Sequence, residues 1–219
     1  MISQDRLRIL ARELGVRQGY AGKNYVNSWL LWGIFTSDYG DNLSFKDGTA
    51  LPKLYFPQSW RSSGDLDFGV EGEYQGSKQE LRTFLDTIAD RSGIEFEIRE
   101  HHESQQDHYP THYVDTSIQY RAVLNHPNTT SIDVMVDEHV AFNPVQHTHA
   151  YEDVPESDLQ AYSVEEIFAE KPGQSTSAGP LVTTTTSINC SKPIQSRSIL
   201  PTSDPPSRQS AITMSSPLI

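Results

Sequence analysis

The sequence predicts a mixed α+β body from Met1 to Lys171, followed by a disordered tail from Pro172 to Ile219. Two observations support this prediction. Helical and alternating apolar patterns are interleaved along the body, whereas the tail is rich in Ser, Thr and Pro and has no Phe, Trp, Tyr or Glu. Such a tail buries too little apolar surface to offset the entropy of ordering, so we expect no core in it.

The first half of the body predicts two helices and a short strand. Leu7, Leu10 and Leu14 recur at helical spacing, and residues 25–35 form a second helix that is apolar on nearly every face. A strand over residues 43–45 runs into Gly48-Thr49, and a short helix through Leu51 and Leu54 follows. The helix over 25–35 has so little polar surface that we expect it to be well buried.

The second half predicts alternating strands and two capped helices. Residues 66–68, 94–98, 114–124 and 132–136 have strand character. A capping box from Ser77 to Glu80 opens a helix that Gly93 ends. A second capping box, from Ser163 to Glu166, opens a last helix that Pro172 stops.

Composition excludes several classes of protein. The 219 residues carry a formal net charge of −12, which argues against a protein held on nucleic acid by broad phosphate neutralisation. The single cysteine, Cys190, excludes a disulfide framework and a cysteine zinc site within one chain. We see neither an apolar run of about 18 residues nor a signal peptide, so we expect a cytoplasmic protein.

Asp65 and Asp67 lie two residues apart on a predicted strand. This spacing places both carboxylates on one face, while Leu66 and Phe68 point to the other. Converging carboxylates suit Mg²⁺, which prefers oxygen ligands and completes its shell with water and substrate phosphates. Two such ions about 3.5–4 Å apart can activate an attacking hydroxyl and stabilise a leaving pyrophosphate.

The segment before this pair predicts a phosphate seat. A strand ending near Lys46, then Gly48, then a helix N-terminus lets backbone N–H groups approach an anion. The Thr49 hydroxyl can donate to a phosphate oxygen, and Arg61 can contact phosphate or fix a carboxylate. We therefore assign Lys46, Gly48, Thr49 and Arg61 to nucleotide binding.

A third carboxylate is usual in such sites, and Asp133 is the best candidate. The apolar residues of the strand over 132–136 face one way and Asp133 faces the other. Asp137 and Glu138 are rivals. We expect Asp65, Asp67 and Asp133 to be the catalytic residues and the metal ligands.

These residues also admit other interpretations. An Asp-x-Asp pair alone is more often a solvated strand edge, and the combination with Gly48-Thr49 and Arg61 is what favours a site. His101-His102 and the pair of His147 with His149 offer a competing metal site, but without a third spaced ligand they are typical of loop histidines. A serine or cysteine nucleophile has no supporting motif.

At these residues the sequence resembles the AbiEii/AbiGii-type toxin nucleotidyltransferases, a branch of the polymerase-β-like superfamily. Residues 45–55 resemble the family's phosphate-binding segment, 61–68 its Arg-x-Ser-x-Asp-Leu-Asp-Phe metal motif, and 131–134 the strand with the third acid. Residues 162–171 resemble its Glu-Glu-x-x-Ala-Glu-Lys segment, in which Lys171 is expected to contact nucleotide. Asp47 stands where the family usually has the first glycine of a Gly-Gly pair.

The resemblance implies a small mixed sheet flanked by helices, with residues 1–40 as a helical part and 41–171 as the catalytic core of one nucleotidyltransferase domain. It further implies Mg²⁺-dependent transfer of a nucleotide from an NTP, with tRNA as a candidate acceptor. The protein would be the toxin of a bacterial toxin–antitoxin or abortive-infection system, with a cognate antitoxin as partner and no stable binding to DNA or membranes.

The resemblance stops at Lys171, where composition changes in mid-helix. Because family members continue there in a helical region, we expect a truncated or frameshifted product. The sequence leaves two alternatives open. One is a catalytically inactive remnant that at most binds an antitoxin, and the other is a small-molecule nucleotidyltransferase.

Overall fold

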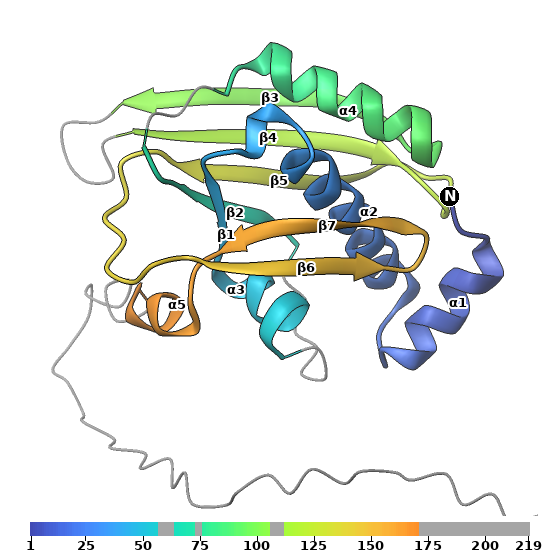
Figure 1. Ribbon diagram of the computed structural model, residues 1–219. Helices are drawn as coiled ribbons and strands as arrows, with labels where there is room; N and C mark the ends of the chain where they lie inside the picture. Colours follow the sequence, from blue (N-terminus) through green and yellow to red (C-terminus); the bar gives the residue numbers. More distant parts are fainter. Residues whose placement is uncertain (57–63, 73–75, 106–111, 171–219) are drawn as a thin grey trace, which may run out of the picture. The chain divides into compact units, whose positions relative to one another are not determined.

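A seven-stranded mixed sheet in the order β3-β4-β5-β2-β1-β7-β6 forms the centre of the fold (Figure 1). The computed structural model describes residues 1–56, 64–72, 76–105 and 112–170. The predicted α+β class, a mixed sheet flanked by helices, is confirmed. Arg61, Lys171 and the predicted disordered tail lie outside the described residues.

The chain alternates between helices and strands in a simple order. The helices are α1 (Gln4–Glu13), α2 (Gln18–Phe35), α3 (Asp47–Ala50), α4 (Lys78–Ser92) and α5 (Val164–Glu170), with a 3₁₀ turn, η1 (Asp38–Gly40), and a π turn, η2 (Leu51–Tyr55). The strands are β1 (Leu43–Lys46), β2 (Leu66–Val70), β3 (Glu95–Gln105), β4 (His112–Arg121), β5 (Asn128–Met135), β6 (Val145–Tyr151) and β7 (Val154–Ala161).

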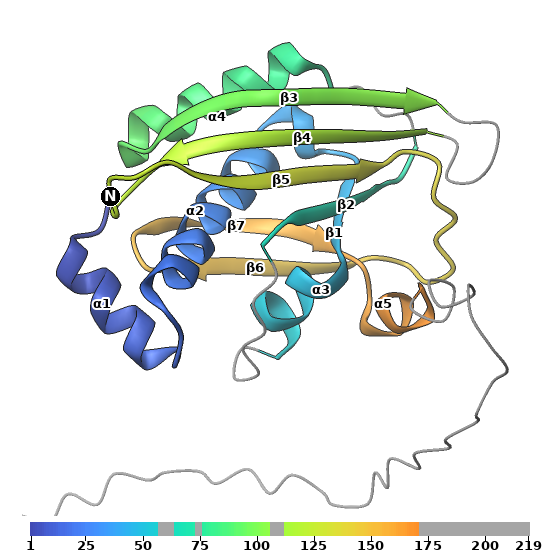
Figure 2. The same cartoon turned by 180° about the vertical axis from the view of Figure 1, so that it is seen from behind.

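Helix α2 is the buried helix of the structure, as the sequence predicted, but it begins seven residues earlier, at Gln18. It packs against β7, α1 and α4, and both views of the ribbon show α1 lying beside it (Figures 1 and 2). Its last residue, Phe35, lies with its ring centroid 6.0 Å from that of Phe68 on β2. The apolar face of the sheet is therefore the face that α2 covers.

No helix of the described residues is long and apolar enough to cross a membrane.

Local signals fix the limits of α4 as predicted. The Ser77 hydroxyl accepts from Glu80 N, and the Glu80 carboxylate accepts from Ser77 N, which completes the capping box. Gly93 ends the helix with φ of 72°, a left-handed conformation that glycine adopts at little cost.

The second predicted capping box forms only in part. Ser163 accepts from Glu166 N at 3.2 Å, as expected for the start of α5. The Glu166 carboxylate does not return to Ser163; it accepts from Ala141 N and Phe142 N of the loop before β6. Glu166 is 3% exposed, so this tertiary contact satisfies a buried carboxylate that the local motif would have left at the surface.

The largest difference from prediction is the β6–β7 hairpin. Residues 145–161 were not predicted as strands because two buried polar residues, His149 and Ser157, interrupt the buried apolar positions of the hairpin. His149 and Ser157 are register partners in this hairpin, and both are buried. An inner face with histidine and serine hides the apolar alternation on which strand prediction depends.

Candidate metal and nucleotide site

Four charged residues form a row across neighbouring strands. In the strand register Asp115 of β4 lies opposite Asp133 of β5, Asp133 opposite Asp67 of β2, and Asp67 opposite Lys46 of β1. Neighbouring strands are about 4.8 Å apart, and residues opposite each other share a face. Since Leu66 and Phe68 are buried on the face under α2, the row lies on the other face. The sequence prediction that Asp67 and Asp133 come together is thus matched by their positions.

Both carboxyl groups of this pair have raised pKa values. Burial, then repulsion from Asp67 and Asp115, raises the pKa of Asp133 to about 7. Burial, then repulsion from Asp47, raises the pKa of Asp67 to about 6, although Lys46 opposes this shift. In the metal-free protein the two carboxyl groups therefore resist being ionised together. A divalent cation would remove that conflict.

Asp115 was not singled out from the sequence. It lies next to Asp133 in register, and a hydrogen bond between the two side chains adds to the raised pKa of Asp133. The sequence signal that could have identified Asp115 is its place between Val114 and Thr116, two residues that are buried on the opposite face of β4. That alternation shows which face Asp115 occupies but not which neighbour it meets.

Lys46 forms a buried ion pair with Glu138, in the loop after β5. The side chains of Lys46 and Glu138 are 8% and 11% exposed. The Tyr162 hydroxyl donates to the same carboxylate at 3.2 Å, and its ring lies under the Lys46 ammonium. Glu138, a rival for the third acid in the sequence analysis, is thus engaged with Lys46. The other rival, Asp137, accepts from His112 N at 3.2 Å.

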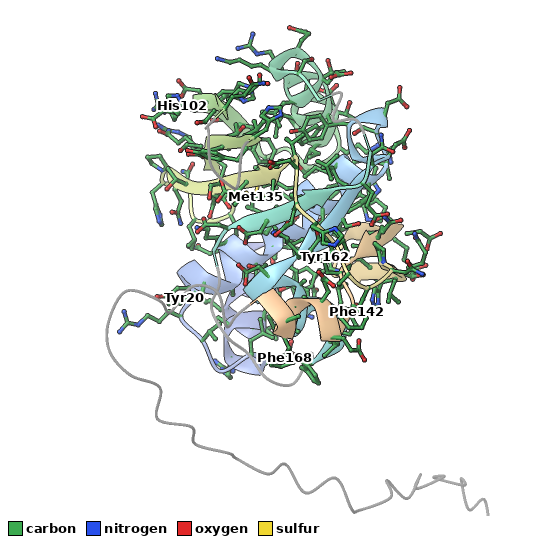
Figure 3. The ribbon with its side chains drawn as sticks, turned by 90° about the vertical axis from the view of Figure 1, so that its left-hand side faces the viewer. Tyr20, His102, Met135, Phe142, Tyr162 and Phe168 are labelled. Carbon is green, nitrogen blue, oxygen red and sulfur yellow. The ribbon has the colours of Figure 1, made fainter. Side chains whose placement is uncertain are left out.

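The Tyr162 side chain lies directly over Gly69 of β2. A Cβ atom on Gly69 of β2 would lie 1.9 Å from the Tyr162 hydroxyl oxygen, so no side chain fits there. The Tyr162 carbonyl accepts from the Tyr55 hydroxyl at 2.7 Å. In Figure 3 Tyr162 appears between Met135 of β5 and Phe142. Tyr162 therefore links η2, β2 and the loop after β5 around the row of charges.

The Gly48-Thr49 segment is held against the acidic segment. The Thr49 hydroxyl donates to the Asp65 backbone carbonyl at 2.8 Å, and Thr49 is 3% exposed. A phosphate contact from this hydroxyl would need that bond to break. Asp47, the first residue of α3, has φ of 62°, a left-handed conformation that costs an L-residue about 1–2 kcal/mol. A glycine at this position would adopt that φ at little cost.

Asp65 points toward a residue that the sequence analysis did not select. Its Oδ1 lies 3.6 Å from the Nζ of Lys23 on α2. Among the residues that the structure describes, no three His, Cys, Asp or Glu side chains are close enough to hold a metal ion as they stand. Asp67 and Asp133 fit the hard oxygen donors that Mg²⁺ prefers. Asp65 would have to turn from Lys23 to join them.

The histidines lie on strands, so the expectation of loop histidines is wrong. His101 and His102 are in β3, and His147 and His149 are in β6. Burial lowers the pKa of His149 to about 3, and His147 packs edge-on against Tyr55 with ring centroids 4.7 Å apart. These inward positions arise from strand pairing with β7, which the polar sequence did not reveal.

Comparison with known proteins gives a family for this arrangement. The sequence matches the model of the AbiEii family, described as nucleotidyl transferase AbiEii toxin of a type IV toxin–antitoxin system, over residues 29–171. A search of curated proteins gave no match.

Two solved structures match part of this chain. MenT4, the nucleotidyltransferase toxin Rv2826c from Mycobacterium tuberculosis H37Rv, is 19% identical with a TM-score of 0.48, over 76% of this chain and 57% of that one. JHP933 from Helicobacter pylori is 14% identical with a TM-score of 0.41, over 67% of this chain and 53% of that one. The chain thus spans a little over half the length of these proteins.

The family match begins within α2 and contains β1, β2, β4 and β5, the strands that carry the row of charges. It also covers well over half of the chain. The resemblance inferred from residues 45–68 is therefore confirmed, and this chain belongs to the AbiEii nucleotidyltransferase toxin family of type IV toxin–antitoxin systems.

Proposed function

We propose that this chain catalyses Mg²⁺-dependent transfer of a nucleotide from an NTP to an acceptor hydroxyl. The observation that supports this most strongly is the pairing of Asp67 with Asp133 in register on adjacent parallel strands. Burial raises the pKa of both carboxyl groups, and repulsion from Asp67 adds to the raised pKa of Asp133. Such a pair is costly in a metal-free protein, and its cost is explained if it holds a cation.

The residues divide into two binding roles in this proposal. Asp67, Asp133 and, after turning, Asp65 hold the cation. Bound Mg²⁺ would supply charge neutralisation for the triphosphate and polarise the phosphorus under attack. The backbone at Gly48 and the positive charges of Arg61 and Lys171 bind the phosphates, although Arg61 and Lys171 lie outside the described residues.

The chemical step is an in-line displacement at the α-phosphorus. The acceptor oxygen forms a bond to phosphorus as the bond to the pyrophosphate oxygen breaks, and pyrophosphate leaves with its electron pair. Asp133 takes the proton of the acceptor hydroxyl. Its position supports this role, because Asp133 lies in register beside Asp67, a carboxylate that would hold the cation.

The acceptor and partner follow from the family in this proposal. A type IV toxin–antitoxin toxin is expected to have a cognate antitoxin, and tRNA is the acceptor we propose. The formal net charge of −12 means that RNA would be recognised through a local patch, not by the whole surface. A screen of aminoglycosides as acceptors separates this proposal from a small-molecule nucleotidyltransferase.

Labelled NTPs test the proposal directly. Purified protein would be incubated with each of the four NTPs, Mg²⁺ and total tRNA, beside the variants Asp67→Asn and Asp86→Asn. Asp86 is an exposed carboxylate on α4, far from the row in the fold, and serves as the matched control. We expect incorporation by the wild type and the control but not by Asp67→Asn. Equal incorporation by all three would refute the site.

A second candidate is a protein that keeps the fold without turnover. The observation in its favour is Asp47, which adds a negative charge and a left-handed backbone to the phosphate seat. Under this alternative the wild type binds an antitoxin but incorporates no nucleotide, and Asp47→Gly restores incorporation.

A further inference from the structure

We propose that Lys23 exchanges one anion for another during nucleotide binding. In the metal-free protein it holds the Asp65 carboxylate, and when Asp65 turns to the cation its ammonium contacts the triphosphate. This inference rests on the proposed nucleotidyltransferase function. It adds a nucleotide contact from α2, outside the segments that carry the family motifs.

The first observation is the ion pair itself. The Lys23 Nζ lies 3.6 Å from Asp65 Oδ1, and the two side chains are 23% and 54% exposed. The lysine side chain is thus partly covered, whereas the aspartate side chain is exposed. Ion pairs with an exposed partner are weak, so a divalent cation can displace Lys23 from Asp65.

The second observation is that the chain makes room for the ammonium. A Cβ atom on Gly64 would lie 2.5 Å from the Lys23 Nζ and 3.0 Å from its Cε. Any other residue at position 64 would push the lysine away from Asp65. The ammonium therefore lies against the backbone that leads into the metal motif.

The third observation is that the same backbone is fixed from two other sides. The Gly64 carbonyl accepts from Asn27 Nδ2 at 3.0 Å and from the Thr130 hydroxyl at 2.9 Å. Asn27 is one helical turn after Lys23, so both project from the same face of α2. Helix α2 thus sets the distance between the Lys23 ammonium and the acidic row.

These contacts explain why the carboxylates are not yet assembled. Asp67 and Asp133 face each other, whereas Asp65 is paired with Lys23, and no three such side chains of the described residues form a metal site. When Asp65 joins a cation, the Lys23 ammonium loses its partner and repels the cation. An ammonium in that state favours the triphosphate that accompanies the cation, because its three donors match phosphate oxygens.

The test compares Mg²⁺ binding with nucleotide binding by isothermal titration calorimetry. The proteins are the wild type, Lys23→Met, Lys23→Arg and the control Lys78→Met, which removes an exposed lysine of α4. Lys23→Met should bind Mg²⁺ alone about threefold more tightly, since a competing cation is removed. It should bind a non-hydrolysable NTP with Mg²⁺ about tenfold more weakly. Lys23→Arg and Lys78→Met should resemble the wild type in both measurements.

The opposite signs distinguish this role from a structural one. A lysine that only supports the fold would, when removed, weaken both ligands together, and urea unfolding of each variant checks the fold. Unchanged NTP affinity in Lys23→Met, or weaker binding of both ligands, would overturn the role of Lys23. Wild-type protein that binds Mg²⁺ but no NTP would instead contradict the proposed function.

Discussion

Substitutions of Asp47 separate two unfavourable effects of an aspartate in the phosphate seat, its left-handed backbone and its negative charge. The backbone at this residue has φ of 62°, where a Cβ atom costs about 1–2 kcal/mol and Asp or Asn somewhat less. The carboxylate also raises the pKa of Asp67, as the largest contribution after burial. Asp47→Gly removes both costs, Asp47→Asn removes only the charge, and Asp47→Ala removes the charge but keeps the Cβ atom.

The magnitudes set an order of stability that urea unfolding can measure. Asp47→Gly should be about 1 kcal/mol more stable than Asp47→Ala, because glycine alone relieves the left-handed backbone. Asp47→Asn should lie within about 0.5 kcal/mol of the wild type, since relief of repulsion is offset by loss of a favourable charge at a helix start. An alanine variant as stable as the glycine variant would refute the reasoning.

Three further predictions concern stability in the metal-free protein. The pKa of Asp133 is raised from 3.8 to about 7, so between those values the folded state keeps a proton that the unfolded chain has lost, and stability falls as pH rises. Asp133→Asn should reduce that slope in urea unfolding, with the remainder due to Asp67, and add about 2 kcal/mol at pH 8, less than the full shift because the side chain is partly exposed. An unchanged slope would contradict the raised pKa. Burial lowers the pKa of Lys53 from 10.5 to about 7, so wild-type stability rises with pH across that window. Lys53→Met should therefore be more stable than the wild type by about 1–2 kcal/mol at pH 6, with no advantage at pH 10; an equal difference at both pH values would show that the lysine is not desolvated. Gly69→Ala should destabilise the fold by about 1–3 kcal/mol because it displaces Tyr162, whereas Gly19→Ala, with nothing within 4 Å of the added atom, should not.

The parts of the fold that were predicted correctly are those with local signals. The capping box and Gly93 defined α4, and the alternation around Asp133 placed that residue on the correct face of β5. Both patterns depend only on neighbours in the sequence. The predicted convergence of Asp65 with Asp67 did not hold, because β2 begins at Leu66 and the Asp65 carboxylate is paired with Lys23.

The parts that were missed depend on contacts between distant segments. Helix α2 begins early because Ala21 packs into a small cluster with Leu7 and Ala11 of α1, which no periodicity in residues 18–24 indicates. The buried residue of β6 is the polar His149, so the sequence of this strand lacks the apolar alternation that predicts a strand. Lys23 lies 42 positions from Asp65 in the chain, and only the packing of α2 brings them together.

The central claim is that Asp67 and Asp133 form the cation and triphosphate site. Calorimetric titration of a non-hydrolysable NTP with Mg²⁺ into the wild type, Asp67→Asn, Asp133→Asn and the exposed control Asp86→Asn tests it most directly. We predict binding by the wild type and the control, and affinity at least about tenfold weaker in Asp67→Asn and Asp133→Asn. Equal affinity in all four proteins would contradict the claim.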